Sequence, residues 1–222
     1  MARRRTCAVA VTRGLLRCGV VAGPLFVTVF AVEGARRADY SAKCHPVSAL
    51  ALGPAGWVQT ANFAAAGALT VAGAVGLSRA GDGGAGGRLG PVLIGAAGVG
   101  LLASGAFPTD PVNDYPPGTA DLAVAATSAG VWHNVASVPV LVGLSVAALA
   151  SARQVRRGGA HLWCLYSAAS GASAVVNGAL ASAGFGGAQA FAGRAGLHQR
   201  AAIGALLGWT TAVFVRALRR AG

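Results

Sequence analysis

Charged residues are scarce in this chain. Asp, Glu, Lys and Arg together make up 11% of its 222 residues, whereas a soluble domain carries about 25%. A soluble fold of this size cannot cover its surface with so few ionic groups. The mean hydropathy is correspondingly high, at +0.60. The composition therefore excludes an ordinary soluble domain and a disordered chain, and it indicates an integral membrane protein.

Acidic residues are the scarcest charged groups. The chain has six of them against 18 Lys and Arg, which gives a formal net charge of +12. A basic surplus of this size can mark a nucleic-acid-binding surface. Here, however, the basic residues lie almost entirely between apolar runs, where they act as topology signals. We therefore expect no nucleic-acid partner.

Potential metal and haem ligands are also few. The chain has four Cys and four His, with no close-set Cys pair and no H-x-x-x-H or H-E-x-x-H motif. His133 and His198 could face one another across a haem, but a transmembrane electron carrier would need a second pair at the opposite side, where only His161 lies. We therefore expect no metal site and no cofactor.

Long apolar runs dominate what remains. Six of them can each cross a hydrocarbon core of about 30 Å, which requires about 20 helical residues. They cover approximately residues 15–35, 57–77, 90–107, 128–150, 162–184 and 197–217. The first run is not followed by a small-residue cleavage site, so we expect it to be retained. The sequence predicts one domain over residues 1–222, an all-α integral membrane bundle of six transmembrane helices.

The basic residues are distributed unevenly between the two sides of this bundle. Thirteen of the 18 lie in the N-terminal segment, the second and fourth connections and the C-terminal segment. The third connection instead carries Asp110, Asp114 and Asp121 and no basic residue. The positive-inside rule then places both termini in the cytoplasm, in a multi-pass protein of the plasma membrane.

Small residues and prolines predict how the helices pack. Small side chains recur at four-residue spacing, which favours close helix contacts and equally suits a homo-oligomer. These stripes are Gly204 and Gly208; Ser170, Ala174 and Gly178; and Ala96, Gly100 and Ser104. Pro24 and Pro139 each remove one backbone hydrogen bond from a run, and they predict bends in the first and fourth helices.

Polar side chains inside the runs gather towards one side of the membrane. Such groups are costly in lipid and usually face the bundle interior or a wet cavity. We therefore predict a polar pocket opening to the extracytoplasmic side, with an Asp110–Arg200 ion pair and with His133 sharing the Asp110 proton. The first outer connection is long, and Pro46–Leu52 within it is expected to form a short helix over the pocket. The predicted binding residues are His45, Ser48, Gln59, Asn62, Asp110, His133, Asn177 and Arg200.

Four segments together resemble a known family. They are YSAKCHPVSALALGPAGWVQTANF at 40–63, GAFPTDP at 105–111, a His early in the fourth run, and GLHQR at 196–200. From about residue 18 to 218 the chain is similar to the bacterial membrane family catalogued as domain of unknown function nine hundred and ninety-eight. This resemblance implies six helices and a membrane location, but no settled activity. The residues that match its motifs are His45, Pro46, Ser48, Trp57, Gln59, Pro108, Asp110, His133 and Arg200.

Three functions fit the predicted pocket. In the first, it binds a small amphipathic or lipid-like molecule from the bilayer, with Arg36, Arg37 and Arg200 on an anionic head group. In the second, Asp110 and His133 form an acid–base pair, with Ser48 as nucleophile, in an enzyme acting on a lipid-linked substrate. In the third, the polar groups only fix the helix register of a structural membrane subunit.

Overall fold

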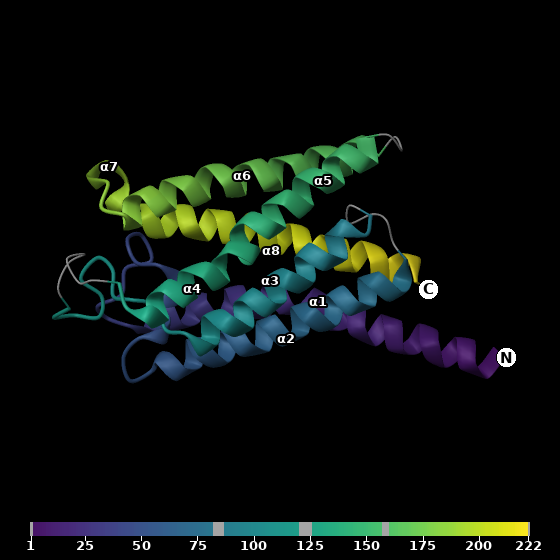
Figure 1. The fold of residues 1–222 in the computed structure, drawn as a ribbon, viewed down its shortest axis with the longest axis horizontal. Helices are drawn as coiled ribbons and strands as arrows, with labels where there is room; N and C mark the ends of the chain where they lie inside the picture. The colour runs from purple at the N-terminus through teal and green to yellow at the C-terminus, as the bar shows by residue number, and fades with distance from the viewer. Residues whose placement is uncertain (1, 82–86, 120–125, 157–159, 222) are drawn as a thin grey trace.

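The computed structural model describes residues 2–81, 87–119, 126–156 and 160–221, and the regular structure in these ranges is helical (Figure 1). Asp121, predicted to mark an outer connection, lies outside the described residues. The elements in chain order are α1 (Ala2–Arg36), η1 (Val47–Ala51), α2 (Gly56–Ala80), α3 (Leu89–Ala106), α4 (Ser128–Val138), η3 (Pro139–Gly143), α5 (Leu144–Arg156), α6 (His161–Phe185), α7 (Gln189–Ala192) and α8 (Ala195–Arg220).

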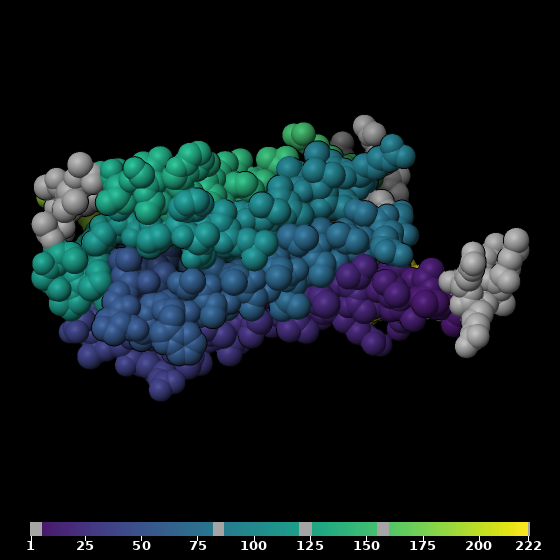
Figure 2. Space-filling view, turned by 60° about the horizontal axis from the view of Figure 1, so that its bottom comes forward, coloured from purple at the N-terminus to yellow at the C-terminus, as the bar shows by residue number. Residues whose placement is uncertain are grey.

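The long helices run up and down beside one another (Figure 1). Both ends of the chain lie at one end of the bundle, which we call the terminal end. The connections between α1 and α2, α3 and α4, and α6 and α8 lie at the opposite end, which we call the loop end. The first turns of α1 project past the other helices at the terminal end, and the surface over α2, α3 and α4 is continuous (Figure 2).

The predicted apolar runs all fall on long helices. Five stretches are long and apolar enough to cross a membrane, namely Thr6–Arg36, Gly56–Ala80, Leu89–Ala106, Ser128–Gln154 and Ala195–Arg220. The remaining predicted run, the fifth in chain order, is α6, which has the same 25-residue length as α2 but is not among the five. Its serines and Asn177 lower its mean hydropathy. The short helix expected at Pro46–Leu52 is present as η1.

The fourth predicted run is a rod made of α4, η3 and α5. Pro139 begins the π-helical turn η3, because its ring nitrogen cannot donate to the carbonyl one turn earlier. The rod crosses the bundle diagonally (Figure 1), so that α4 packs on α3 and α5 packs on α6. α3 packs on the whole rod, whereas α6 packs extensively only on the part from η3 onward.

Glycines determine how closely the helices approach. A Cβ atom on Gly73 would lie 2.7 Å from both the Cα atom of Gly19 and the Phe214 ring, and one on Gly100 would lie 2.5 Å from the Ala136 carbonyl oxygen. The predicted contact at Gly100 is thus confirmed. The expected role of Gly204 in packing within the bundle is wrong, because nothing lies within 4 Å of its Cβ position.

Candidate functional site

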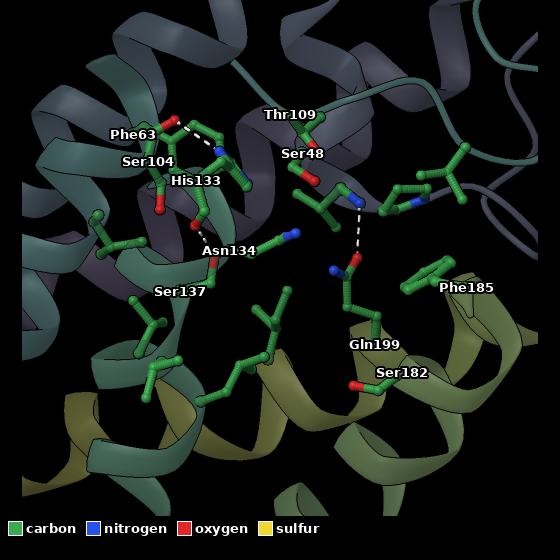
Figure 3. Close-up of a pocket in the computed structure, with 18 of the residues that line it drawn as sticks. Ser48, Phe63, Ser104, Thr109, His133, Asn134, Ser137, Ser182, Phe185 and Gln199 are labelled. Atoms are coloured by element: carbon green, nitrogen blue, oxygen red, sulfur yellow. Dashed lines mark hydrogen bonds between the residues drawn. The ribbon is translucent and has the colours of Figure 1, made fainter. Parts of the chain in front are cut away.

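A cavity of about 790 Å³ lies in the half of the bundle nearer the loop end. This volume is in the range of small-molecule sites, about 300–1,000 Å³. α4 and η3 form one wall and α6 and α8 form the facing wall, as Figure 3 shows. η1 and residues 109–112 contribute the lining at the loop end, and Phe26, Phe63 and Leu101 contribute it from α1, α2 and α3.

The lining changes from polar to apolar along the length of the cavity. On α8, Gln199 is followed by Ile203 and then by Leu206 and Leu207, at helical spacings that keep them on one face. On the rod, Asn134 is followed in the same way by Val138, Leu141 and Leu144, which also line the cavity. Both walls are therefore polar near the loop end and aliphatic towards the middle of the bundle.

Several polar side chains in the cavity have no protein partner. Ser48, Asn134 and Ser182 make no hydrogen bond through their side chains to any other residue that the structure describes, and they surround the cavity in Figure 3. The Gln199 Oε1 atom accepts a hydrogen bond of 2.7 Å from the Val47 backbone N–H. Its amide nitrogen faces the cavity. These groups can donate to and accept from a ligand.

Asp110 lines the cavity, but its carboxylate holds the start of α4. The Thr127 hydroxyl donates to Oδ1 at 2.6 Å and the Thr127 backbone N–H to Oδ2 at 3.1 Å. Thr127 is in turn the N-cap of α4, because its Oγ1 accepts from the Gly130 N–H. A Cβ atom on Gly130 would lie 2.0 Å from Asp110 Oδ2. Glycine is therefore the residue that this close approach requires.

His133 also lines the cavity, and one of its ring nitrogens is engaged by α3. Nδ1 lies 3.1 Å from the Ser104 carbonyl oxygen and 2.8 Å from that of Phe107. Both partners are acceptors, so Nδ1 carries the proton and donates. The ring packs edge-on against Phe63 at a centroid separation of 6.0 Å. No hydrogen bond joins His133 to Asp110 among the described residues, so the predicted proton sharing is wrong.

Arg200 lies outside the cavity lining and holds the α1–α2 connection. Its Nη1 donates to the carbonyl oxygens of Ala42 at 2.8 Å and His45 at 3.0 Å, and its Nη2 donates to the Tyr40 hydroxyl. The predicted Asp110–Arg200 ion pair is wrong. The one ion pair within the described part of the chain joins Arg37 to Glu33 at 3.6 Å.

His45 fixes the same connection to the α3–α4 connection. Its Nδ1 accepts from the Ser41 N–H at 2.9 Å, and its Nε2 donates to the Asn113 carbonyl oxygen at 3.0 Å. This pattern requires a neutral ring with the proton on Nε2. Burial lowers the pKa of His45 below its usual value and raises the pKa of the neighbouring Tyr40 hydroxyl, although Arg200 opposes the second shift.

The Arg37 side chain also joins segments of the loop end by hydrogen bonds. Its guanidinium donates to the carbonyl oxygens of Leu52 at 3.1 Å and Ala55 at 2.9 Å, and to the Tyr115 hydroxyl at 3.0 Å. Arg37 and Arg200 therefore do not provide the head-group site that the sequence suggested, because neither lines the cavity.

Three predicted amide residues lie between helices. Asn62 donates to the Phe26 carbonyl oxygen at 3.1 Å and to Gln59 Oε1 at 3.2 Å, which joins α2 to α1. The Gln59 Nε2 and Asn62 Oδ1 atoms are buried without a hydrogen-bond partner. Asn177 Oδ1 lies 2.9 Å from the His198 Nδ1 atom, which joins α6 to α8. None of the three amides lines the cavity.

The family described as "Protein of unknown function (DUF998)" matches residues 20–216. The chain belongs to this family. No curated protein and no solved structure matches it. The DUF998 match begins within α1 and ends within α8, and it includes every residue that lines the cavity.

The structure thus divides the predicted site residues of this DUF998 chain. Ser48, Asp110 and His133 line one cavity, whereas the other five hold helices or connections in place. The polar lining residues outside the predicted binding set are Ser104, Thr109, Asn134, Ser137, Ser182 and Gln199. Among the residues described, no group of three or more His, Cys, Asp or Glu side chains could hold a metal ion.

Proposed function

We propose that this protein crosses the plasma membrane six times, with α6 crossing in addition to the five candidate spans and with both termini in the cytoplasm. α6 packs against α5 and α8 (Figure 1), and at 25 residues it would measure about 37 Å. Its exposed side includes Leu162, Leu165, Val175 and Val176. A helix of this length with an apolar outer face fits the same bilayer as its neighbours.

The cavity is proposed to bind a small amphipathic molecule. The observation that carries this function is the polar-to-apolar gradient on both walls, from Gln199 to Leu206 on α8 and from Asn134 to Leu141 on the rod. A ligand with one hydrogen-bonding end and one aliphatic end would satisfy both parts of the lining. A wholly polar ligand would leave its own groups unpaired against the leucines.

The polar end of this ligand is proposed to be uncharged. The hydrogen-bonding side chains in the lining without a protein partner are neutral, as Ser48, Asn134 and Ser182 show. The guanidinium groups of Arg37 and Arg200 already serve backbone carbonyls outside the cavity. Hydroxyl, ester or amide groups fit this environment better than phosphate does, because a buried anion needs a cation.

Native mass spectrometry of the protein extracted in a mild detergent tests this function. We expect the wild type to retain an amphiphile, and Asn134→Leu/Ser182→Leu to retain at least tenfold less, since each lost hydrogen bond weakens binding by about 1 kcal/mol. The matched control is Val135→Leu/Ala179→Leu on the same two helices, at exposed positions outside the lining. Equal retention by both double variants, or none by the wild type, would contradict the proposal.

Acid–base catalysis has weaker support than binding. Ser48, Asp110 and His133 share the cavity, but the Asp110 carboxylate accepts from Thr127, the N-cap residue of α4, and the His133 Nδ1 atom donates to two carbonyls. A purely structural role also has weaker support, because the Asn134 and Ser182 side chains make no hydrogen bond to another residue in the part of the chain that the structure describes.

A further inference from the structure

We propose that the ligand enters the cavity sideways from the bilayer, between the rod at α4–η3 and the loop end of α6. This access route rests on the proposed binding function. It follows from three observations, which concern the end of the cavity, its side, and the surfaces around that side.

Hydrogen-bonded segments cover the loop end of the cavity. η1 lies there, and Gln199 of α8 holds it through the Val47 N–H at 2.7 Å. Residues 109–112 continue the cover. The Asn113 side chain donates to the Cys44 carbonyl at 3.0 Å, and the Asn113 carbonyl accepts from His45 at the same distance. Asn113 has a φ of 55°, a left-handed conformation that asparagine tolerates. Access from the aqueous end would break these bonds.

The side of the cavity is open. α4 packs on α3 and has no extensive contact with α6 or α8, while the rod packs on α6 from the π-helical turn onward. Residues on both walls line the cavity and are nevertheless exposed. They are Asn134, Val138 and Val142 on the rod and Ser182 and Gly186 at the end of α6. We call this gap, bordered by Asn134, Val138, Val142, Ser182 and Gly186, the side opening.

The surfaces beside the side opening are apolar. Val131, Trp132 and Val135 are exposed on α4, and Val175 and Val176 are exposed on α6. Exposed side chains of this kind in a membrane bundle face acyl chains rather than water. An amphiphile dissolved in the bilayer could therefore reach the cavity without crossing an aqueous phase.

This route also orients the ligand. The polar lining of Ser48, Asn134 and Gln199 lies towards the loop end, and Leu141, Leu144 and Leu206 lie deeper in the bundle. A lipid in the adjacent leaflet already has its polar end near the membrane surface and its chain towards the midplane. It could move sideways into the cavity without turning over.

Spin-label accessibility in phosphatidylcholine vesicles tests the route independently of any bound ligand. In a chain with its four cysteines replaced by Ser, nitroxide labels are placed at the side opening on Val142→Cys and Ser182→Cys. Val176→Cys provides the lipid-facing reference, and Ala188→Cys in the α6–α8 connection provides the aqueous reference. At Val142, Ser182 and Val176 we expect the nitroxide to collide more often with oxygen than with a water-soluble nickel chelate. At Ala188 we expect more collisions with the nickel chelate than with oxygen. Nickel-dominated collisions at Val142 and Ser182 would overturn lateral access even if the cavity binds an amphiphile.

A blocked side opening gives a second measurement. The variant Val142→Trp/Gly186→Trp fills the side opening without removing a hydrogen-bonding side chain. It should slow uptake of a pyrene-labelled monoacylglycerol from vesicles several-fold while the final amount bound stays within twofold of wild type. The matched control, Val146→Trp/Val175→Trp, adds the same bulk at exposed positions outside the lining and should leave the rate unchanged. Unchanged uptake in the blocked variant would contradict the route, whereas absence of binding in the wild type would contradict the proposed function instead.

Discussion

The two ends of the bundle are held together by different forces. At the terminal end, glycines bring α1, α2 and α8 into direct contact around Phe214, and the buried Trp209 donates to Ser167 on α6 at 3.0 Å. At the loop end, guanidinium groups bind backbone carbonyls around a cavity of about 790 Å³. Close packing leaves no room for a ligand, whereas hydrogen-bonded connections can cover a space without filling it.

The cavity arises from the path of the rod. Small residues draw α3 and α4 together at Gly100, and Gly171 brings α6 against Leu149 of α5. The rod contacts α3 along its whole length but contacts α6 extensively only from η3 onward, and a space remains between α4 and α6. Small residues at helix crossings therefore bring the helices into contact at the terminal end, whereas along the rod they hold α4 and α5 in positions that leave a space beside α6.

Substitution of a glycine at the terminal end should have the largest effect. In Gly73→Val, side-chain atoms would collide with Gly19 and Phe214, and we expect a loss of about 3 kcal/mol in the free energy of unfolding. Helicity during titration with a denaturing detergent measures this change. Gly204→Val is the control, because nothing lies within 4 Å of its Cβ position, and it should change stability by no more than about 0.5 kcal/mol. Similar losses of stability in both variants would contradict the conclusion that Gly73 lies in a close helix contact and Gly204 does not.

Removal of the guanidinium at the loop end should have an intermediate effect. Arg200→Gln loses hydrogen bonds to Ala42, His45 and Tyr40, and we expect a loss of about 2 kcal/mol. Arg194→Gln is the control, since its exposed side chain makes no hydrogen bond to another described residue.

The same variant distinguishes this network from an ion pair. Arg200 and Asp110 share no hydrogen-bond partner, so the effects of Arg200→Gln and Asp110→Asn should add within about 0.5 kcal/mol. A double variant as stable as either single variant would show that the two charges interact after all.

A change of pH should have the smallest effect. Burial lowers the pKa of His45 in the folded protein, so the unfolded chain binds the proton more readily. The stability that neutral His45 provides is therefore complete above its usual pKa of about 6.5 and is lost as the pH falls below that value. We expect unfolding titrations between pH 7.5 and 5 (roughly the range over which histidine titrates) to show a decrease that His45→Gln removes. His161→Gln is the control, and it should leave the decrease in place.

The helices were predictable because a bilayer imposes a simple length requirement on apolar runs. The predicted limits 90–107 and 162–184 differ from α3 (Leu89–Ala106) and α6 (His161–Phe185) by one residue at each end. η1 was also predictable, since Pro46 suits the start of a short helix. α1 is longer than predicted and begins at Ala2, because a helix can continue beyond the apolar run that identifies it.

The partners of polar groups were less predictable. Asp110 and Arg200 have opposite charges at one end of the bundle, which suggested an ion pair. The α1–α2 connection, however, leaves the carbonyl oxygens of Ala42 and His45 outside any helix, and such groups need donors. Backbone acceptors have no signature in the sequence, so the real partners of Arg200 could not be recognised. Asn134 and Gln199 directly follow His133 and His198 in the sequence, and both line the cavity. Which of two neighbouring side chains faces the cavity depends on the rotation of the helix about its own axis.

The sequence by itself determined that the chain is a helical membrane protein, because the long apolar runs and the scarcity of charge leave no other class. The tertiary structure decided where space remains between those helices. A cavity depends on which helices pack together and on where along a rod such as α4–η3–α5 a further helix comes into contact. Both follow from contacts between residues far apart in the chain. The polar groups that face this space are therefore visible in the sequence only as isolated residues, and they become a site only when the helices are assembled.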